Sequence, residues 1–248
     1  MSKKKSPSKK SAAEPGPRRI RKTVRPYVAV TFAMTVDGKI TTRNLSAIDF
    51  TSREDKSHLI RQRALGDAVL IGHSTLKKDN VRLSIGRPEL RAERLARGQS
   101  EYPLRVIVSN EGRIDPALNV FQTDFAPIII FSTVNMPIKV QKKLREKAIL
   151  HLSETSTVDL RWMLLQLRRE YGVKRVACEG GAALFRSLLK LKLVDQLNLT
   201  LAPLLFGGAK APTLTGTGFG FLPRTIRCSL QEMKVIGDEC FLTYTLHW

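Results

Sequence analysis

A pair of adjacent glycines, Gly180 and Gly181, constrains the fold of this chain more than any other feature. The apolar run 173–177 before them is short enough for a buried strand, and the large apolar residues between 184 and 189 are spaced for one face of a helix. Glycines at such a junction let the backbone approach a ligand closely, and the helix start presents unpaired N–H groups. The stretch therefore indicates either a phosphate site or a tight turn without a ligand.

Strands and helices are expected to alternate along most of the chain. The patterns predict strands at 27–35, 68–71, 104–108, 128–131, 149–152, 173–177 and 196–201, and helices from 51 or 52 to 65, over 137–147 and 160–171, and after the glycine pair. Residues 82–100 are polar and arginine-rich and are expected to form a loop. Residues 225–236 and 239–247 flank an Asp-containing turn and predict an antiparallel hairpin. The alternation predicts an α/β fold with a mostly parallel sheet and helices on both faces.

The net charge of +20 is unevenly distributed. Residues 1–25 hold ten Lys and Arg and one Glu, with almost nothing to bury, so we expect a disordered basic tail there. Residues 26–248 are expected to form one folded domain. The tail is either a weak contact for nucleic acid or a solvating extension without a specific partner.

Cysteine and histidine usage argues against disulfides and metal sites. Cys178, Cys228 and Cys240 are an odd number without metal-ligand spacing, which favours reduced thiols in a cytoplasm. The four histidines show no paired spacing, so no metal is expected. No apolar run approaches the ~20 residues that a membrane helix needs.

Polar residues and glycines gather where the expected strands end. These positions are 35–39, 72–79, 109–112, 132–133 and 179–183. Open α/β sheets bind ligands at the carboxyl ends of their strands, so this edge suits a dinucleotide and a polar substrate. No Gly-x-Gly-x-x-Gly follows the first strand, and no nucleophile elbow is present. The residues alone thus indicate an α/β protein with a site for a phosphorylated ligand.

Five blocks of sequence, in order, make the chain similar to a known family. They are 32–40 (FAMTVDGKI), 66–83 (GDAVLIGHSTLKKDNVRL), 104–113 (LRVIVSNEGR), 173–185 (VKRVACEGGAALF) and 193–214 (LVDQLNLTLAPLLFGGAKAPTL). Together they resemble the RibD C-terminal type of riboflavin biosynthesis reductase. The resemblance covers all but the tail and implies a three-layer, dihydrofolate-reductase-like fold. The family's separate zinc deaminase domain has no counterpart here, because the chain lacks its His-x-Glu and Pro-Cys-x-x-Cys signature.

The resemblance implies an NADPH-dependent reduction carried out by a homodimer, and the cysteines favour a cytoplasmic location. The substrate would be a pyrimidine with a ribosylamino 5′-phosphate group, and hydride transfer to C1′ would give a ribityl chain. Whether that pyrimidine has been deaminated is left open. Two alternatives also remain: a pterin, dihydrofolate or other small-molecule reductase of the same fold, and a basic nucleic-acid-binding protein.

The resemblance also implies roles for individual residues. Cofactor-binding positions are Thr75, Asp79, Asn110, Gly180, Gly181, Ala182 and Ala183. Substrate-binding positions are Arg63, Leu83, Arg87 and Glu179. Candidate catalytic residues are Asp37, Lys39 and Glu179, and water is a further candidate proton donor. Arg113 is a candidate cation for the 2′-phosphate of NADPH.

Several positions depart from the family pattern. Where the family often has Gly-Glu-Ser-x-Trp, this chain has Leu45 to Phe50, which lacks the tryptophan that would stack on nicotinamide. The family's Asp-Asp-Pro-x-Leu is replaced by residues 79–83, which read DNVRL. Both changes lie around the expected ligands and therefore keep a different substrate open.

Overall fold

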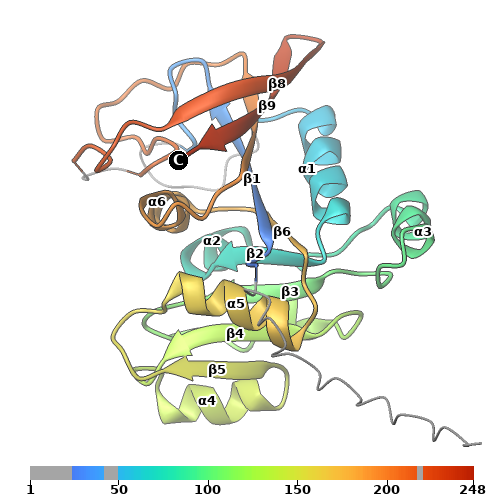
Figure 1. Cartoon of the computed structure of the whole chain (residues 1–248), viewed down its shortest axis with the longest axis vertical. Coiled ribbons are helices and arrows are strands. Elements are labelled where there is room, and N and C mark those ends of the chain that lie inside the picture. The colour runs from blue at the N-terminus through green and yellow to red at the C-terminus, as the bar shows by residue number, and fades with distance from the viewer. Residues whose placement is uncertain (1–23, 42–49, 217–219) are drawn as a thin grey trace, which may run out of the picture.

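The computed structural model describes residues 24–41, 50–216 and 220–248 (Figure 1). Nine strands in these residues form one sheet with the order β5-β4-β3-β2-β6-β1-β7-β9-β8. The strands are β1 (Tyr27–Thr35), β2 (Ala68–Gly72), β3 (Leu104–Val108), β4 (Ile128–Thr133), β5 (Ile149–Ser153), β6 (Arg175–Cys178), β7 (Gln196–Ala202), β8 (Arg227–Ile236) and β9 (Glu239–His247). β1 to β7 pair in parallel, whereas β9 is antiparallel to both β7 and β8. The predicted mostly parallel sheet and closing hairpin are thus confirmed.

The helices are α1 (Arg53–Leu65), α2 (His73–Asp79), α3 (Pro88–Ala96), α4 (Ile138–Arg145), α5 (Leu160–Glu170) and α6 (Ala182–Lys190), with a short 3₁₀ turn, η1 (Asn119–Gln122). Four of the helices, α1, α4, α5 and α6, lie where the sequence predicts them. α1 begins where the sequence indicates, because the Ser52 hydroxyl accepts hydrogen bonds from the N–H groups of Glu54 and Asp55. Ser52 in turn donates through its N–H and its hydroxyl to the buried carboxylate of Glu239, so the hairpin anchors the start of α1.

Helices cover both faces of the sheet, as predicted (Figure 1). Successive strand residues point to opposite faces, so Leu70 packs with the apolar sides of α5 and α6, while Val69 and Ile71 pack with those of α2 and α4. The apolar stripe of α5 is buried at all four positions used to predict it, Leu160, Met163, Leu164 and Leu167. The two faces together form the core.

The expectation of a loop over residues 82–100 is wrong for its centre, which forms α3. Pro88 occupies the first turn, where its missing N–H costs no hydrogen bond. Leu90 and Arg94 are the buried residues of this helix. Arg94 donates to the carbonyl oxygens of Ala64 and Gly66, which ties α3 to the end of α1.

The central strands bring the expected site residues to one edge. β6 lies between β2 and β1, and Cys178 at its end pairs with Leu70 and Val30. Gly72, Glu179 and the segment after Thr35 therefore lie at the same carboxyl edge.

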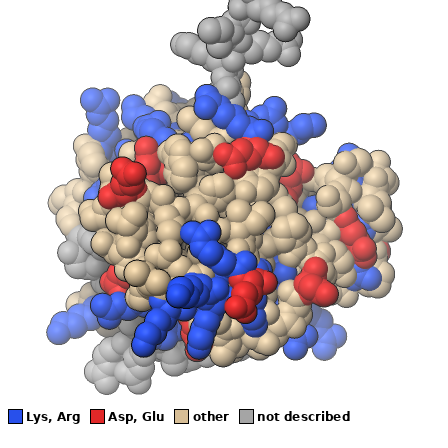
Figure 2. Space-filling view, turned by 90° about the horizontal axis from the view of Figure 1, so that it is seen from below, with Lys and Arg blue, Asp and Glu red and all other residues tan. Residues whose placement is uncertain are grey.

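The chain has charged surfaces outside this edge. Residues 1–23 of the expected tail lie outside the described residues, while Arg25 at its end forms an ion pair with Asp195 at 2.6 Å. Viewed from below, Lys and Arg side chains form separate groups with Asp and Glu among them, rather than one continuous basic surface (Figure 2). No helix among the described residues is long and apolar enough to cross a membrane.

Candidate active site

The turns after β2 and β6 meet closely, in a feature that we call the glycine corner: Gly72, Thr75, Gly180 and Gly181. The Gly72 N–H donates to the Gly180 carbonyl at 3.0 Å. A Cβ on Gly181 would lie 2.3 Å from the Thr75 Oγ1, and one on Gly180 would lie 3.3 Å from the Phe32 ring. The close approach leaves no room for a side chain at Gly181, and Gly180 also has a φ of +94°, a conformation that favours glycine. The glycine pair thus lies at a strand-to-helix junction, as the sequence indicated, and it also approaches the end of β2 closely.

The start of α6 adds unpaired N–H groups to the corner. Gly181 caps the helix without a side-chain hydrogen bond, and its carbonyl accepts the first intrahelical bond, from Phe185. The N–H groups at the start of the helix, at Ala182 and Ala183, have no acceptor within the helix. Backbone donors, a nearby hydroxyl on Thr75 and the positive end of the helix dipole are the chemistry that a pyrophosphate requires, so these residues fit the expected nucleotide.

Glu179, the residue before the glycine pair, is held by Arg63 of α1. The Arg63 Nε and Nη2 donate to the two carboxylate oxygens at 2.6 and 2.7 Å, and its Nη1 donates to the Ser84 carbonyl. Both side chains are less than one tenth exposed. Such a two-pronged pair fixes the carboxylate and balances its charge, so the chain orients Glu179 before any substrate binds.

Asp79, at the end of α2, is electrostatically linked to this pair. Desolvation raises the pKa of the Asp79 carboxyl, and the negative charge of Glu179 raises this pKa further, while Lys78 lowers it. Thr75, Asp79, Gly181 and Glu179 are thus brought together from two different strand ends.

Asp37 has a structural set of partners. Its carboxylate accepts from the Thr35 hydroxyl at 2.5 Å and from the N–H groups of Phe206 and Gly207 at 3.1 and 2.7 Å. These hydrogen bonds, that of Thr35 first, lower the pKa of Asp37, so the group is ionised near neutral pH and is a poor proton donor. It ties the end of β1 to the loop after β7.

Lys39 lies in the same turn as Asp37. Its N–H and carbonyl bond to Thr35, whereas its ammonium group makes no hydrogen bond or ion pair with any described residue. The N–H groups of the ammonium are therefore available to donate hydrogen bonds to a ligand.

Two expected substrate residues have other surroundings. The Leu83 side chain is 1% exposed and packs with Val69 and Ile71, so only its backbone is available to a ligand. Arg87 donates to the hydroxyl of Ser57 on α1. Arg63 and Arg87 together hold the segment before α3 against α1.

Asn110 lies further along the carboxyl edge, after β3. Its side-chain oxygen accepts from the Val158 N–H at 3.0 Å, and its carbonyl accepts from the Thr133 hydroxyl at 2.7 Å. In the part of the chain that the structure describes, these bonds connect Asn110 to β4 and to the segment before α5, not to the glycine corner.

Sequence reasoning missed two features near these residues. His73 follows Gly72, and its Nε2 is buried without a partner among the described residues; burial, and then the charge of Lys77, lower its pKa. The ring of Phe50 packs edge-on against that of Phe206 at 5.3 Å, close to Asp37. Residues 45–49 of the altered segment lie outside the described residues. The position of His73 just after a predicted strand is the one sequence signal that it lies near the site. The contact between Phe50 and Phe206 can be known only from the folded structure.

Glycines and helix starts at the carboxyl edge of a mostly parallel sheet are the arrangement of α/β enzymes that bind nucleotides. A sequence model of one family, the RibD C-terminal domain, matches residues 26–242. The chain belongs to this family, as its five sequence blocks indicated.

Named relatives and a solved structure agree with this assignment. The 2,5-diamino-6-ribosylamino-4(3H)-pyrimidinone 5′-phosphate reductase of Methanothermobacter thermautotrophicus is 32% identical over 90% of this chain and 99% of its own length. Its counterpart in Archaeoglobus fulgidus is 31% identical, over 89% and 98%. The crystal structure of a pyrimidine reductase-like protein from Corynebacterium diphtheriae has a TM-score of 0.76 and 21% identity, covering 90% of this chain and 92% of that protein, which shows a shared fold.

Proposed function

We propose that the protein is an NADPH-dependent reductase of riboflavin biosynthesis, acting on 2,5-diamino-6-ribosylamino-4(3H)-pyrimidinone 5′-phosphate. It would convert the ribosyl group to a ribityl chain. The observation that carries the proposal is a fixed carboxylate beside the glycine corner: the Thr75 hydroxyl lies against Gly181, and Glu179, which Arg63 holds, directly precedes Gly180. Two relatives named for this reaction match nearly their whole length, which supports the diamino compound over its deaminated form.

The residues of the corner would hold the cofactor. We assign the pyrophosphate to the N–H groups at the start of α6, at Ala182 and Ala183, with the Thr75 hydroxyl beside them. Arg113, exposed after β3, is the cation that we assign to the 2′-phosphate. When bound, NADPH supplies the hydride for the reduction.

The ribose ring would first open: the C1′–O4′ bond breaks, the proton of the attached N–H group passes to O4′, and an imine forms between C1′ and that nitrogen. The reduction then adds a hydride to C1′ and a proton to the nitrogen. Asp37 is ionised and accepts three hydrogen bonds, so it is a poor source of that proton. The Lys39 ammonium group has no partner among the described residues, and we assign Lys39 as the donor of that proton. Glu179 keeps further lone pairs on the oxygens that Arg63 binds, and we assign it to amino or hydroxyl groups of the substrate.

A direct assay tests this function. Purified full-length protein is mixed with NADPH and the diamino phosphate, and the absorbance of reduced nicotinamide is followed. We expect turnover of this compound, slower turnover of its deaminated analogue, and none of dihydrofolate. Turnover of dihydrofolate without turnover of either pyrimidine would replace the proposal with the alternative reductase.

We further propose that the enzyme is a cytoplasmic homodimer. β8 is an edge strand whose Leu230, Met233 and Val235 are 50%, 61% and 62% exposed, which fits pairing with a second copy. Free thiols at all three cysteines suit a reducing compartment. Weak nucleic-acid contact by the tail stays a prediction, tested by deleting residues 1–25 and measuring RNA binding at two salt concentrations.

A further inference from the structure

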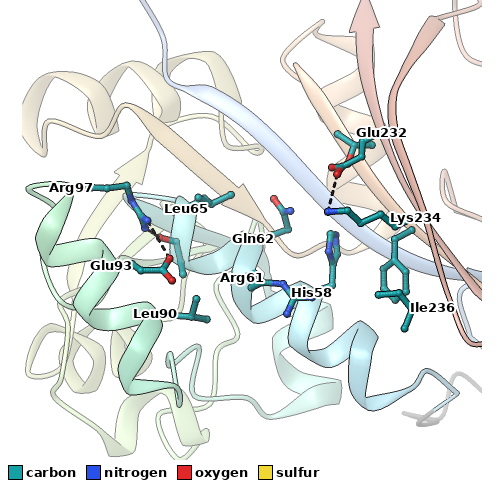
Figure 3. Close-up of a pocket in the computed structure, with 13 residues that line it drawn as sticks. His58, Arg61, Gln62, Leu65, Leu90, Glu93, Arg97, Glu232, Lys234 and Ile236 are labelled. Atoms are coloured by element: carbon teal, nitrogen blue, oxygen red, sulfur yellow. Dashed lines mark hydrogen bonds and ion pairs between the residues drawn. The ribbon is translucent and has the colours of Figure 1, made fainter.

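A groove runs beside α1, from the amino ends of β3, β6 and β7 to the hairpin of β8 and β9. It consists of two adjoining cavities of about 310 and 800 Å³, which share Gln62, Leu65, Arg97, Glu232 and Thr243. We call these two cavities together the basal groove. Figure 3 shows the smaller one, with side chains of α1 and α3 on one side and of β8 on the other.

The larger cavity is cationic. Arg97, Lys174 and Arg175 line it, and the Lys174 ammonium makes no hydrogen bond or ion pair with a described residue. Arg94 lines it as well, and Arg97 forms an ion pair with Glu93 at 3.5 Å, so four cations face the two carboxylates of the lining, Asp67 and Glu232. Asp67 accepts from the N–H groups of Lys174 and Arg175 at 2.8 and 2.9 Å, and Glu232 pairs with Lys234 at 2.8 Å. The cavity therefore favours an anion.

The smaller cavity has an apolar floor. Leu65, Leu90 and Phe241 line it, and the His58 ring packs against that of Phe241 at 5.4 Å. Burial, and then the charge of Arg61, lower the pKa of His58, so the imidazole is neutral near pH 7 and adds to the apolar surface. Such a floor suits a flat aromatic ring.

Two residues that line the groove have buried polar atoms without partners among the described residues. They are Oε1 of Gln62, an acceptor, and Nε of Arg175, a donor. Buried polar groups in folded proteins nearly always have a partner. A bound molecule that draws either side chain toward it would supply one.

We propose that the basal groove binds a small phosphorylated aromatic molecule of the nucleotide class. Its phosphate lies against Lys174, Arg175 and Arg97, and its ring points toward Leu65 and Phe241. Arg175 begins β6 and Glu179 follows the end of that strand, so the two sites are about 13 Å apart along it. The cationic cavity is thus separate from Glu179, and the proposal does not rest on the proposed reaction.

Calorimetric titration of the full-length protein tests the groove. The probes are uridine 5′-monophosphate, uridine and inorganic phosphate. The variant is Lys174→Glu, since this exposed side chain has no described partner to lose, and the matched control is Lys142→Glu on the exposed face of α4. We expect Lys174→Glu to weaken binding of the monophosphate at least tenfold, Lys142→Glu to leave it unchanged, and uridine to bind at least tenfold more weakly than the monophosphate.

Three outcomes would overturn the proposal. The first is equal affinity of the wild type and Lys174→Glu for the monophosphate. The second is a loss of affinity in Glu179→Gln with none in Lys174→Glu, which would move the binding to the candidate active site. The third is the absence of binding together with protection of Lys174 from acetylation that rises with protein concentration, which would mean that a second copy of the chain covers the groove. Thermal melting of each variant checks that it is folded.

Discussion

Gly181 has no space for a methyl group, because its Cβ would lie 2.3 Å from the Thr75 hydroxyl oxygen. We therefore expect Gly181→Ala to displace the Thr75 side chain or the backbone of the glycine corner and to lower the free energy of unfolding by about 1–3 kcal/mol. Binding of NADPH should weaken as well, since the displaced N–H groups belong to the assigned pyrophosphate site. Urea denaturation and a fluorescence titration with NADPH measure the two effects.

A matched glycine and a double variant control this experiment. Gly86 has no atom within 4 Å of its would-be Cβ, so Gly86→Ala should be neutral or slightly stabilising. Replacing Thr75 by Ala in the Gly181→Ala background removes the Oγ1 atom that the new methyl group would overlap, and it should recover stability. A fully stable Gly181→Ala would contradict the close approach.

The Arg63–Glu179 pair is mostly buried, so each charge depends on the other. Glu179→Gln leaves the Arg63 guanidinium without its counter-charge, and we expect a loss of about 3–5 kcal/mol in the free energy of unfolding. The substitution should also raise KM for the pyrimidine phosphate. Arg63→Lys keeps the charge but not the two-pronged geometry, so it should retain more stability than Glu179→Gln while still raising KM. If Glu179→Gln unfolds at the same urea concentration as the wild type, the pair is not a buried anchor.

Asp37 predicts an acid-dependent loss of stability. Its pKa in the folded protein is below the usual 3.8, so the stabilisation by its ionised form is fully present above pH 3.8 and is lost as the pH falls through the folded value. Asp37→Asn should therefore melt at a lower temperature than the wild type at pH 7, with the difference shrinking below pH 4. Glu146→Gln, an exposed change at the end of α4, should leave both melting temperatures unchanged. A constant difference across this pH range would assign the effect of Asp37→Asn to packing.

The sequence predicted site residues best where their position along the chain determines their place. Glu179, Gly181 and Thr75 follow predicted strands, and parallel strands end at one edge, so their meeting was derivable. The burial of Leu83 and the hydrogen bond from the Phe206 N–H to Asp37 could not be derived from the sequence. Both depend on contacts between segments that are separated along the chain. The predicted ends of the strands indicate which residues lie at the same edge of the sheet. They do not indicate which of these residues form hydrogen bonds or ion pairs with each other.

Among the elements, α3 was missed because its buried side is not a stripe of apolar residues. One leucine, Leu90, and one arginine, Arg94, are its buried residues, and Leu95 is 57% exposed. A search for apolar periodicity counts every arginine as a surface residue. The segment that forms α3 was therefore predicted to be a polar loop. α5 was readable, since its four apolar positions are all buried. Pro88 was the available signal for the start of α3.

Arg94 makes a testable link between α3 and α1. It donates to the carbonyls of Ala64, Gly66 and Ser100, the first of which lies in the last turn of α1, where helical carbonyls lack partners. Arg94→Met should therefore lower the free energy of unfolding by about 3 kcal/mol, because several buried acceptors lose a charged donor. Arg82→Met, at an exposed position before α3, should change it by less than about 0.5 kcal/mol. Equal urea midpoints for the two variants would show that water replaces Arg94 at these carbonyls.

At the scale of the whole molecule, the sheet is covered at its centre and uncovered at one end. The central strands are buried on both faces, whereas β8 is exposed along nearly its whole length on both faces. The hairpin of β8 and β9 was predicted from its turn and its strand-forming residues. Its exposure was not, because burial depends on which elements pack against a strand after folding.

The exposed β8 strand makes self-association the most direct prediction about the whole molecule. Met233 and Val235 are two residues apart on a strand and so share a face, and both are more than 60% exposed. Changing both to lysine places two cations on each copy at the assigned contact, where desolvation and like-charge repulsion oppose pairing. We expect sedimentation equilibrium to show a dimer for the wild type and a dissociation constant at least tenfold higher for the double variant. Ile138→Lys, at a 70% exposed position on α4, should stay dimeric. A double variant that remains dimeric at the same concentration would move the interface away from β8.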